Sequence, residues 1–162
     1  MSDCYIAALR ILNYRFNSEA ELRRKLARKK FEAAEIDKTI AQLHDEKWLD
    51  DERFAGALVR TRANKRLGRK RILRELQAAG VHGETAGKAV EENLDGEREA
   101  EALRELAQKR ARVLARRLGP DFLSTSEGRN KLAVYLLNQG YDAALVYEAV
   151  KEIRVAHHQP DS

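Results

Sequence analysis

Eight positively charged side chains and no acidic one lie between Arg60 and Arg74. They are Arg60, Arg62, Lys65, Arg66, Arg69, Lys70, Arg71 and Arg74. Arg and Lys contacts to phosphate oxygens give an affinity that depends strongly on salt but does not read base sequence. The segment also spans an expected helix end, Gly68 and an expected helix start, where free backbone amides add to an anion site. It is therefore the first candidate for nucleic-acid binding.

Two further basic groups lie elsewhere in the sequence, and the segment from Glu91 to Glu101 is mainly acidic. The groups are Arg23, Arg24, Lys25, Arg28, Lys29 and Lys30, and Lys109, Arg110, Arg112, Arg116 and Arg117. A charge run is often only a solvated helix face. The 60–74 segment is favoured because its like charges repel, so the folded monomer gains nothing evident from them. The predicted DNA- or filament-binding residues are Arg23, Arg24, Lys25, Arg28, Lys65, Arg66, Arg69, Lys70, Arg71 and Arg74.

Aromatic residues that could stack on single-stranded bases are scarce. Tyr14 and Phe16 lie near the second basic group, and we expect both to be core or staple residues. Trp48 is expected to anchor the first structural unit to the second.

Catalytic and metal-binding patterns are absent. The four histidines show no ligand spacing with Cys4 or with a carboxylate cluster. Cys4 lacks an identifiable base and is expected to pack as a small apolar residue. Gly80 to Gly83 has neither the spacing nor the lysine of a phosphate-binding loop. We therefore expect no enzyme activity, no cofactor and no metal.

The composition favours helices with narrow apolar seams. The 162 residues are 35% charged, 43% hydrophobic and only 6% aromatic, and helix formers dominate. The net charge of +5 favours anionic partners. A single cysteine fits a reducing compartment, and no segment has the pattern of a signal peptide or a membrane span. We expect a cytoplasmic monomer without membrane contact.

Apolar spacing reveals an internal repeat. From Leu22, apolar residues follow at offsets of 4, 9, 14 and 18, and the same offsets recur from Ile72 and from Leu132. The fifteen positions are Leu22, Leu26, Phe31, Ile36, Ile40, Ile72, Leu76, Val81, Ala86, Val90, Leu132, Leu136, Tyr141, Val146 and Val150. Each step of 4 stacks side chains on one helix face, so each copy predicts a helix, a turn and a second helix.

The turns and flanking segments complete the pattern. Gly80 and Gly140 precede the turn anchors and can end a helix in the left-handed conformation, whereas Lys30 must use another geometry or accept strain. Ser18 and Glu21 form a capping-box pattern, and Asp50 or Asp51 can cap a helix that runs until Gly68.

A leading helix is expected before each pair, and the third is longer, from about Glu97 to Leu118, stopped by Gly119-Pro120. We predict repeats at 1–47, 48–95 and 96–156, with a disordered tail at 157–162.

The segment Leu49-Asp50-Asp51-Glu52-Arg53-Phe54-Ala55, with Val59, Arg62, Gly68 and Gly80-Val81, resembles the RecX family. The first unit is similar too, at Leu9, Leu12, Arg15, Ser18-Glu19, Leu22 and Phe31. Lys30 and Arg66 stand where that family often has glycine, and Leu58 where it usually has tyrosine.

This resemblance implies an all-α fold of three tandem three-helix repeats forming an elongated, curved array. It also implies a regulator that binds the RecA–DNA filament and inhibits ATP hydrolysis, filament growth and strand exchange. Weak binding to single- and double-stranded DNA, without sequence reading, is implied as well.

Two alternatives remain open. One is a helical DNA-binding protein of helix-turn-helix type that acts without a recombinase, with sequence-selective binding to duplexes. The other is an interaction scaffold whose basic faces only solubilise it. In the second case, replacing Arg69, Lys70, Arg71 and Arg74 by Gln would leave function unchanged.

Overall fold

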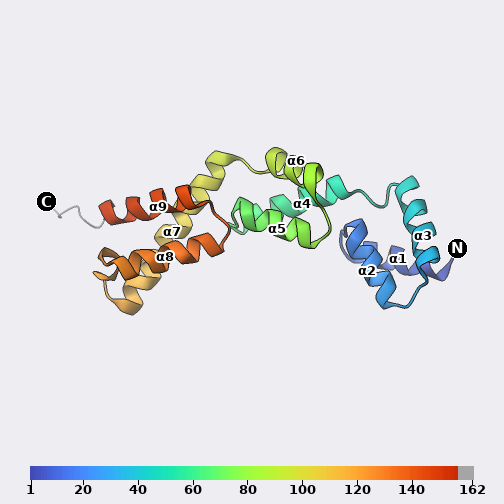
Figure 1. The fold of residues 1–162 in the computed structure, drawn as a ribbon, viewed down its shortest axis with the longest axis horizontal. Coiled ribbons are helices and arrows are strands. Elements are labelled where there is room, and N and C mark those ends of the chain that lie inside the picture. The colour runs from blue at the N-terminus through green and yellow to red at the C-terminus, as the bar shows by residue number, and fades with distance from the viewer. Residues whose placement is uncertain (157–162) are drawn as a thin grey trace. The chain divides into compact units, whose positions relative to one another are not determined.

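A computed structural model describes residues 1–156, with the side chains of residues 1–153, and this part of the chain is helical without strands (Figure 1). The predicted tail at 157–162 lies outside the described residues. The helices are α1 (Asp3–Tyr14), α2 (Glu19–Arg28), α3 (Ala33–Asp45), α4 (Asp51–Asn64), α5 (Arg69–Ala78), α6 (Gly83–Asn93), α7 (Gly96–Leu118), the short η1 (Phe122–Ser124), α8 (Ser126–Asn138) and α9 (Ala143–Ala156). The prediction of an all-α fold built from three tandem three-helix repeats is confirmed.

The apolar positions that define the repeat form the interior. Fourteen of the fifteen are buried, and the exception, Phe31, is partly buried against the core of α1–α3. Because each step of 4 follows one helix face, both helices of a pair turn their seams toward the same core. Cys4 is fully buried in the first repeat, as expected of a small apolar residue.

Local signals set most helix ends. Ser18 and Glu21 form the predicted capping box of α2, and Asp50 accepts the Arg53 amide at 3.1 Å at the start of α4. Gly80 and Gly140 adopt φ of 82° and 97°. Lys30 keeps the same left-handed geometry, with φ of 67°, and accepts the strain.

The predicted end of the fourth helix is wrong. We expected it to run until Gly68, but α4 ends at Asn64. The chain turns at Arg66, whose φ is 57°. A charged residue can take the left-handed conformation at a cost of about 1–2 kcal/mol, so the absence of glycine did not prevent this turn.

The chain divides into two compact units, each with its own core. One comprises Met1–Val59 and Leu73–Asn93, and the other Arg60–Ile72 and the chain from Leu94 onward. The first holds the core of α1–α3, and the second holds the core of α7–α9, where Leu132, Leu136 and Tyr141 are at most 1% exposed. This division cuts through the second repeat, and the repeat boundaries near residues 47 and 95 stay predictions.

In each unit a turn comes into close contact with the start of a helix, at equivalent repeat positions. In the first unit, the turn after α5 meets the start of α2: the Ser18 hydroxyl donates to the Ala79 carbonyl, and a side chain on Gly80 would overlap Ala20. In the second unit, the turn after α8 meets the start of α5. There the Gly68 amide donates to the Gln139 carbonyl at 2.8 Å.

A carboxylate from the next leading helix also caps each of these helix starts. The Glu19 amide donates to Asp51 Oδ1 at 2.9 Å in the first unit, and the Arg69 amide donates to Glu99 Oε1 at 3.0 Å in the second. Glu19 and Arg69 are equivalent repeat positions. Glu99, which the sequence places in a run of surface acids, is only 7% exposed. A carboxylate at a helix N-terminus satisfies a free amide and complements the helix dipole.

Tyr14 and Phe16, which we expected to be core or staple residues, are not in the core, because Tyr14 is 90% exposed and Phe16 54%. Trp48 is 51% exposed, and its role as an anchor stays a prediction. All three stand at or beyond a helix end, where the apolar face of the helix no longer directs side chains inward. The Arg53 guanidinium lies 5.0 Å from the centre of the Phe16 ring.

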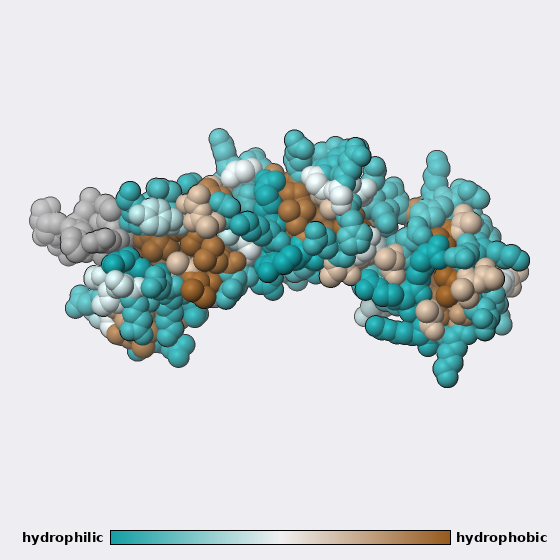
Figure 2. Space-filling view, viewed as in Figure 1, coloured by the Kyte–Doolittle hydropathy of each residue, from teal (hydrophilic) through white to brown (hydrophobic). Residues whose placement is uncertain are grey.

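Hydrophobic residues also reach the surface between α8 and α9, within the second unit (Figure 2). No helix among the described residues combines the length and apolar character needed to cross a membrane.

The part of the chain that the structure describes contains no group of three or more His, Cys, Asp or Glu side chains placed to hold a metal ion.

Candidate nucleic-acid interface

A basic groove lies in the second unit, where the end of α4 meets α7. It is lined by Lys65, Arg66, Glu105, Leu106, Gln108, Lys109 and Arg112, and its volume is about 440 Å³. Four of these side chains are cationic and one is a carboxylate. This groove, which we call the α7 groove, brings part of the favoured basic segment together with part of the third basic group.

Two elements position the cations. Lys109 and Arg112 are exposed and three residues apart on α7, so they share one face of the helix. Lys65 and Arg66 follow the last turn of α4, and the left-handed conformation of Arg66 ends that helix. The Arg66 guanidinium pairs with Glu105 at 3.0 Å.

Tyr141 holds the backbone of this turn. Its hydroxyl donates to the Arg66 carbonyl at 2.7 Å, and the residue is 1% exposed. Burial, with a smaller effect of the nearby Glu99 charge, raises the pKa of Tyr141 to about 12. The phenol therefore remains a neutral donor across the physiological range, and the turn that carries Lys65 and Arg66 is fixed from the core.

The geometry suits a phosphate chain better than a small ligand. Exposed cations on two sides of an open groove can meet successive phosphates, and each contact releases counterions. The single carboxylate, Glu105, is paired with Arg66 and therefore opposes the anion less than a free carboxylate would. Arg and Lys at such a site position a nucleic acid without reading its bases.

The next three basic residues contact partners within the protein. The Arg69 guanidinium lies 3.6 Å from Glu99, the Lys70 ammonium lies 3.4 Å from Asp142, and Arg71 donates to the Gln139 side chain at 3.5 Å. The amide of Ala144 and then Lys70 lower the pKa of Asp142. The expectation that the folded monomer gains nothing from these charges is thus wrong. Two of them pair with carboxylates that are distant in the sequence, one on α7 and one in the turn before α9.

Three candidates on α2 also have internal partners, all in the first unit. Arg23 pairs with Glu19 at 2.9 Å and with Asp37 at 2.6 Å, and the bond to Asp37 is the main cause of its raised pKa. Arg24 donates to the Ala78 carbonyl at 3.0 Å, and Lys25 donates to the Asn17 side chain. Burial, followed by the nearby Arg15 charge, lowers the pKa of Lys25.

Arg28 and Arg74 are exposed, in the first unit. As nucleic-acid contacts, all ten candidates stay predictions, and Lys65 and Arg66 are the two that the α7 groove unites. Sequence reasoning left Lys109 and Arg112 out of the candidate set. Their spacing of three on a long exposed helix was the signal that could have included them.

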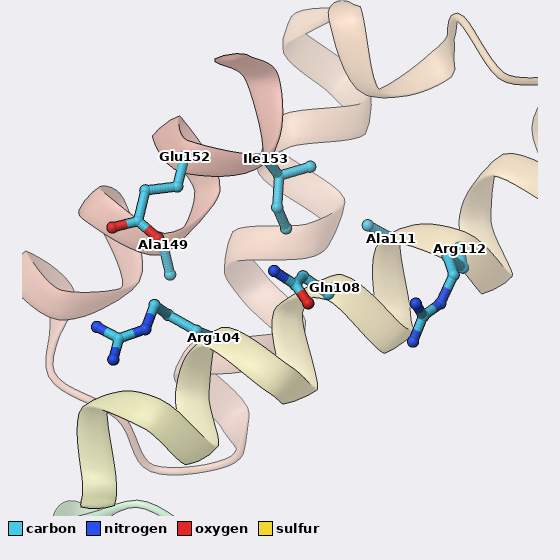
Figure 3. Close-up of a pocket in the computed structure, with 7 residues that line it drawn as sticks. All are labelled: Arg104, Gln108, Ala111, Arg112, Ala149, Glu152 and Ile153. Atoms are coloured by element: carbon cyan, nitrogen blue, oxygen red, sulfur yellow. The ribbon is translucent and has the colours of Figure 1, made fainter. Parts of the chain in front are cut away.

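A second, smaller pocket of about 200 Å³ lies between α7 and α9. Figure 3 shows Arg104 from α7 and Glu152 from α9 at one end of it and Arg112 at the other. Ala111 and Ile153 supply apolar walls. Charges of both signs line this pocket, so it is a weaker anion site than the α7 groove, with which it shares Gln108 and Arg112.

Comparison with known proteins gives a consistent result. The models of the first and second three-helix domains of RecX match residues 4–43 and 50–90. Regulatory protein RecX of Trichlorobacter lovleyi is 35% identical, covering 90% of this chain and 92% of the relative. That of Serratia proteamaculans is 30% identical, covering 87% and 92%. The crystal structure of RecX from Lactobacillus salivarius is 27% identical with a TM-score of 0.78, covering 94% of this chain and 95% of that one. The chain therefore belongs to the RecX family of regulatory proteins.

Proposed function

We propose that this protein binds the RecA–DNA filament as a cytoplasmic monomer and inhibits ATP hydrolysis, filament growth and strand exchange. In this proposal the protein catalyses no reaction itself. Family membership supports the regulatory role, and the α7 groove supports contact with the nucleic acid of the filament. That groove is the observation that carries the proposal, because cations from the turn after α4 and from α7 line the same open groove.

A sequence-selective DNA-binding protein is a weaker candidate. In helix-turn-helix proteins, the N-terminal residues of the recognition helix contact base edges. Here the basic helices α2 and α5 begin at amides capped by Asp51 and Glu99. The turns at Gly80 and Gly140 pack closely against the same two helix starts. Their first turns are therefore occupied by the protein itself, which disfavours insertion into a major groove.

The test is the rate of DNA-dependent ATP hydrolysis by RecA with increasing amounts of this protein. We expect inhibition at or below one molecule per recombinase subunit. The triple variant Lys65→Gln, Lys109→Gln and Arg112→Gln should inhibit less and bind single-stranded DNA with a weaker salt dependence. The slope of log K against log salt is negative, and losing three phosphate contacts would reduce its magnitude by about 2.

A matched control removes the same charge elsewhere. Lys38, Lys88 and Lys131 are exposed on α3, α6 and α8, and their replacement by Gln should leave inhibition and salt dependence nearly unchanged. Absence of both inhibition and filament binding by the wild-type protein would refute the proposal. Tight, sequence-selective duplex binding without recombinase would favour the alternative. If both triple variants lost the same amount of inhibition, the effect would come from net charge and not from the α7 groove.

A further inference from the structure

A second groove, between α8 and α9, has a different chemistry from the α7 groove. Its volume is about 310 Å³, and its lining residues are Arg129, Asn130, Ala133, Leu137, Ala143, Val146, Tyr147, Val150 and Lys151. The floor and walls are apolar, the two charged side chains are both cationic, and no carboxylate is among the lining residues. We call it the α8–α9 groove.

Two of its apolar side chains are open to solvent, above a floor that includes the buried Val146 and Val150. Tyr147 is 67% exposed and Leu137 40%, and Figure 2 shows hydrophobic residues gathered over α8 and α9. The lining positions on α9 recur at helical spacing, from Ala143 through Tyr147 to Lys151, so one helix face forms one wall. A contiguous exposed apolar surface with a polar rim is typical of an interaction site.

The repeat itself provides an internal comparison. Ala133 and Tyr147 occupy the repeat positions of Arg23 and Asp37 in the first repeat. There the two side chains form an ion pair of 2.6 Å between α2 and α3. The same pair of positions is therefore bridged by charge in the first repeat but apolar and open in the third.

The second repeat lacks this surface as well. At the positions of Leu137 and Tyr147 it has Gln77 and Gly87. An apolar groove at this place is consequently a property of the third repeat and not of the repeat pattern. The buried positions that hold the repeat together do not require Leu137 or Tyr147, because both are exposed.

We propose that the α8–α9 groove docks a helical segment of a protein partner that presents apolar side chains flanked by carboxylates. The apolar walls fit one or two aliphatic side chains in the manner of a helix in a groove. Arg129 and Lys151 select for acidic flanks, and Arg129 is held in place by bonds to the Ser124 carbonyl at 2.6 Å and the Ser126 hydroxyl at 3.3 Å. A nucleic acid fits less well, since the walls offer it aliphatic carbon.

This inference rests on the proposed function in one respect: the partner is then a recombinase subunit. The two grooves would then bind different components of the filament: the α7 groove would bind DNA phosphates and the α8–α9 groove would bind the recombinase. Contact with recombinase through an apolar groove would persist at salt concentrations that weaken the phosphate contacts.

The variant that tests it is Leu137→Gln with Tyr147→Gln, in the full chain. Val134→Gln with Leu145→Gln is the matched control, because these residues are 54% and 39% exposed on the same two helices and neither lines the groove. Thermal unfolding verifies that both double variants fold. We expect the groove variant to lose on the order of tenfold or more in affinity for a preassembled RecA–DNA filament. The control variant should bind like the wild type, and binding to DNA alone should be unchanged in both.

A second arm needs no recombinase. The probe is a fluorescent helical peptide with leucine at three- and four-residue spacing and glutamate between, and its counterpart carries lysine in place of glutamate. The wild-type protein should bind the acidic peptide better than the basic one, and the groove variant should bind neither. Lys151→Glu should weaken the preference for the acidic peptide.

The outcomes separate the two proposals. If the wild-type protein binds the acidic peptide through the groove but not the filament, the groove assignment stands and the recombinase role fails. If the filament binds the groove variant as tightly as the wild type, the docking proposal is overturned. If the groove variant lost as much affinity for DNA alone as for the filament, the occupant would be a nucleic acid. If the wild-type protein formed a dimer and the groove variant did not, the occupant would be a second copy of the chain. Either result overturns the proposal.

Discussion

Lys30 closes the turn between α2 and α3 with φ of 67°, at the position that Gly80 and Gly140 hold in the other repeats. A side chain in this conformation costs about 1–2 kcal/mol, while glycine adds entropy to the unfolded chain. We therefore expect Lys30→Gly to raise the free energy of unfolding by up to about 1 kcal/mol. Urea unfolding measures the change.

The neighbouring residue provides the control. Lys29 has φ of −79°, so Lys29→Gly removes the same charge but relieves no strain. It should lower the free energy of unfolding by up to about 1 kcal/mol. Equal effects of the two substitutions would contradict the assignment of strain to Lys30.

Tyr141 links the interior to alkaline stability. Its folded pKa of about 12 lies above the ordinary value of 10, so the unfolded chain loses the phenolic proton first. The stabilisation from the neutral phenol is present below pH 10 and is lost as pH rises toward 12. Tyr141→Phe should cost about 1 kcal/mol at neutral pH, from the lost bond to Arg66.

The measurement is the difference in unfolding free energy between the wild type and Tyr141→Phe as a function of pH. This difference should shrink between pH 10 and about 12, because only the wild type carries the titrating phenol. A constant difference over that range would show that Tyr141 ionises equally in both states.

At the scale of elements, the turns after α5 and α8 contact the preceding repeat through glycine. A methyl group on Gly140 would overlap the Arg71 side chain and backbone, and the position also has φ of 97°. Gly140→Ala should therefore destabilise the fold by about 2–3 kcal/mol or more, from overpacking and from backbone strain together. Thermal or chemical unfolding measures it.

Gly119→Ala isolates the backbone part of that cost. Gly119 has a similar φ of 99°, but a Cβ there would meet nothing within 4 Å. Because φ of 99° with ψ of 151° is a region that essentially only glycine occupies, the expected cost is about 1–3 kcal/mol from backbone strain alone. If both substitutions cost the same, the close contact with Arg71 contributes nothing to the packing of the turn.

At the scale of the whole molecule, the elongated, curved array stays a prediction. Helices of about 15 residues are roughly 22 Å long, so three repeats side by side would span on the order of 70 Å. A compact globule of 162 residues would have a radius of gyration of about 15 Å. We expect small-angle scattering to give a clearly larger value, and one near 15 Å would refute the array.

The sequence by itself determined the helices, the repeat and most of the turns. Those features depend on local rules: a spacing of four on one helix face, glycine at positive φ, and serine with glutamate at a helix start. They hold wherever the segment lies in the fold, so Leu22, Gly80 and Ser18 could be assigned from neighbours alone.

Only the tertiary structure decided which charges meet. Glu105 reaches Arg66 from 39 residues away, and Glu99 reaches Arg69 from 30 residues away. No local pattern encodes these pairs, because they depend on how α7 packs against the end of α4 and the start of α5. The same packing assembled the α7 groove from two basic groups and left Tyr147 exposed where the first repeat has an ion pair. Side-chain periodicity describes one helix, and a site arises between helices.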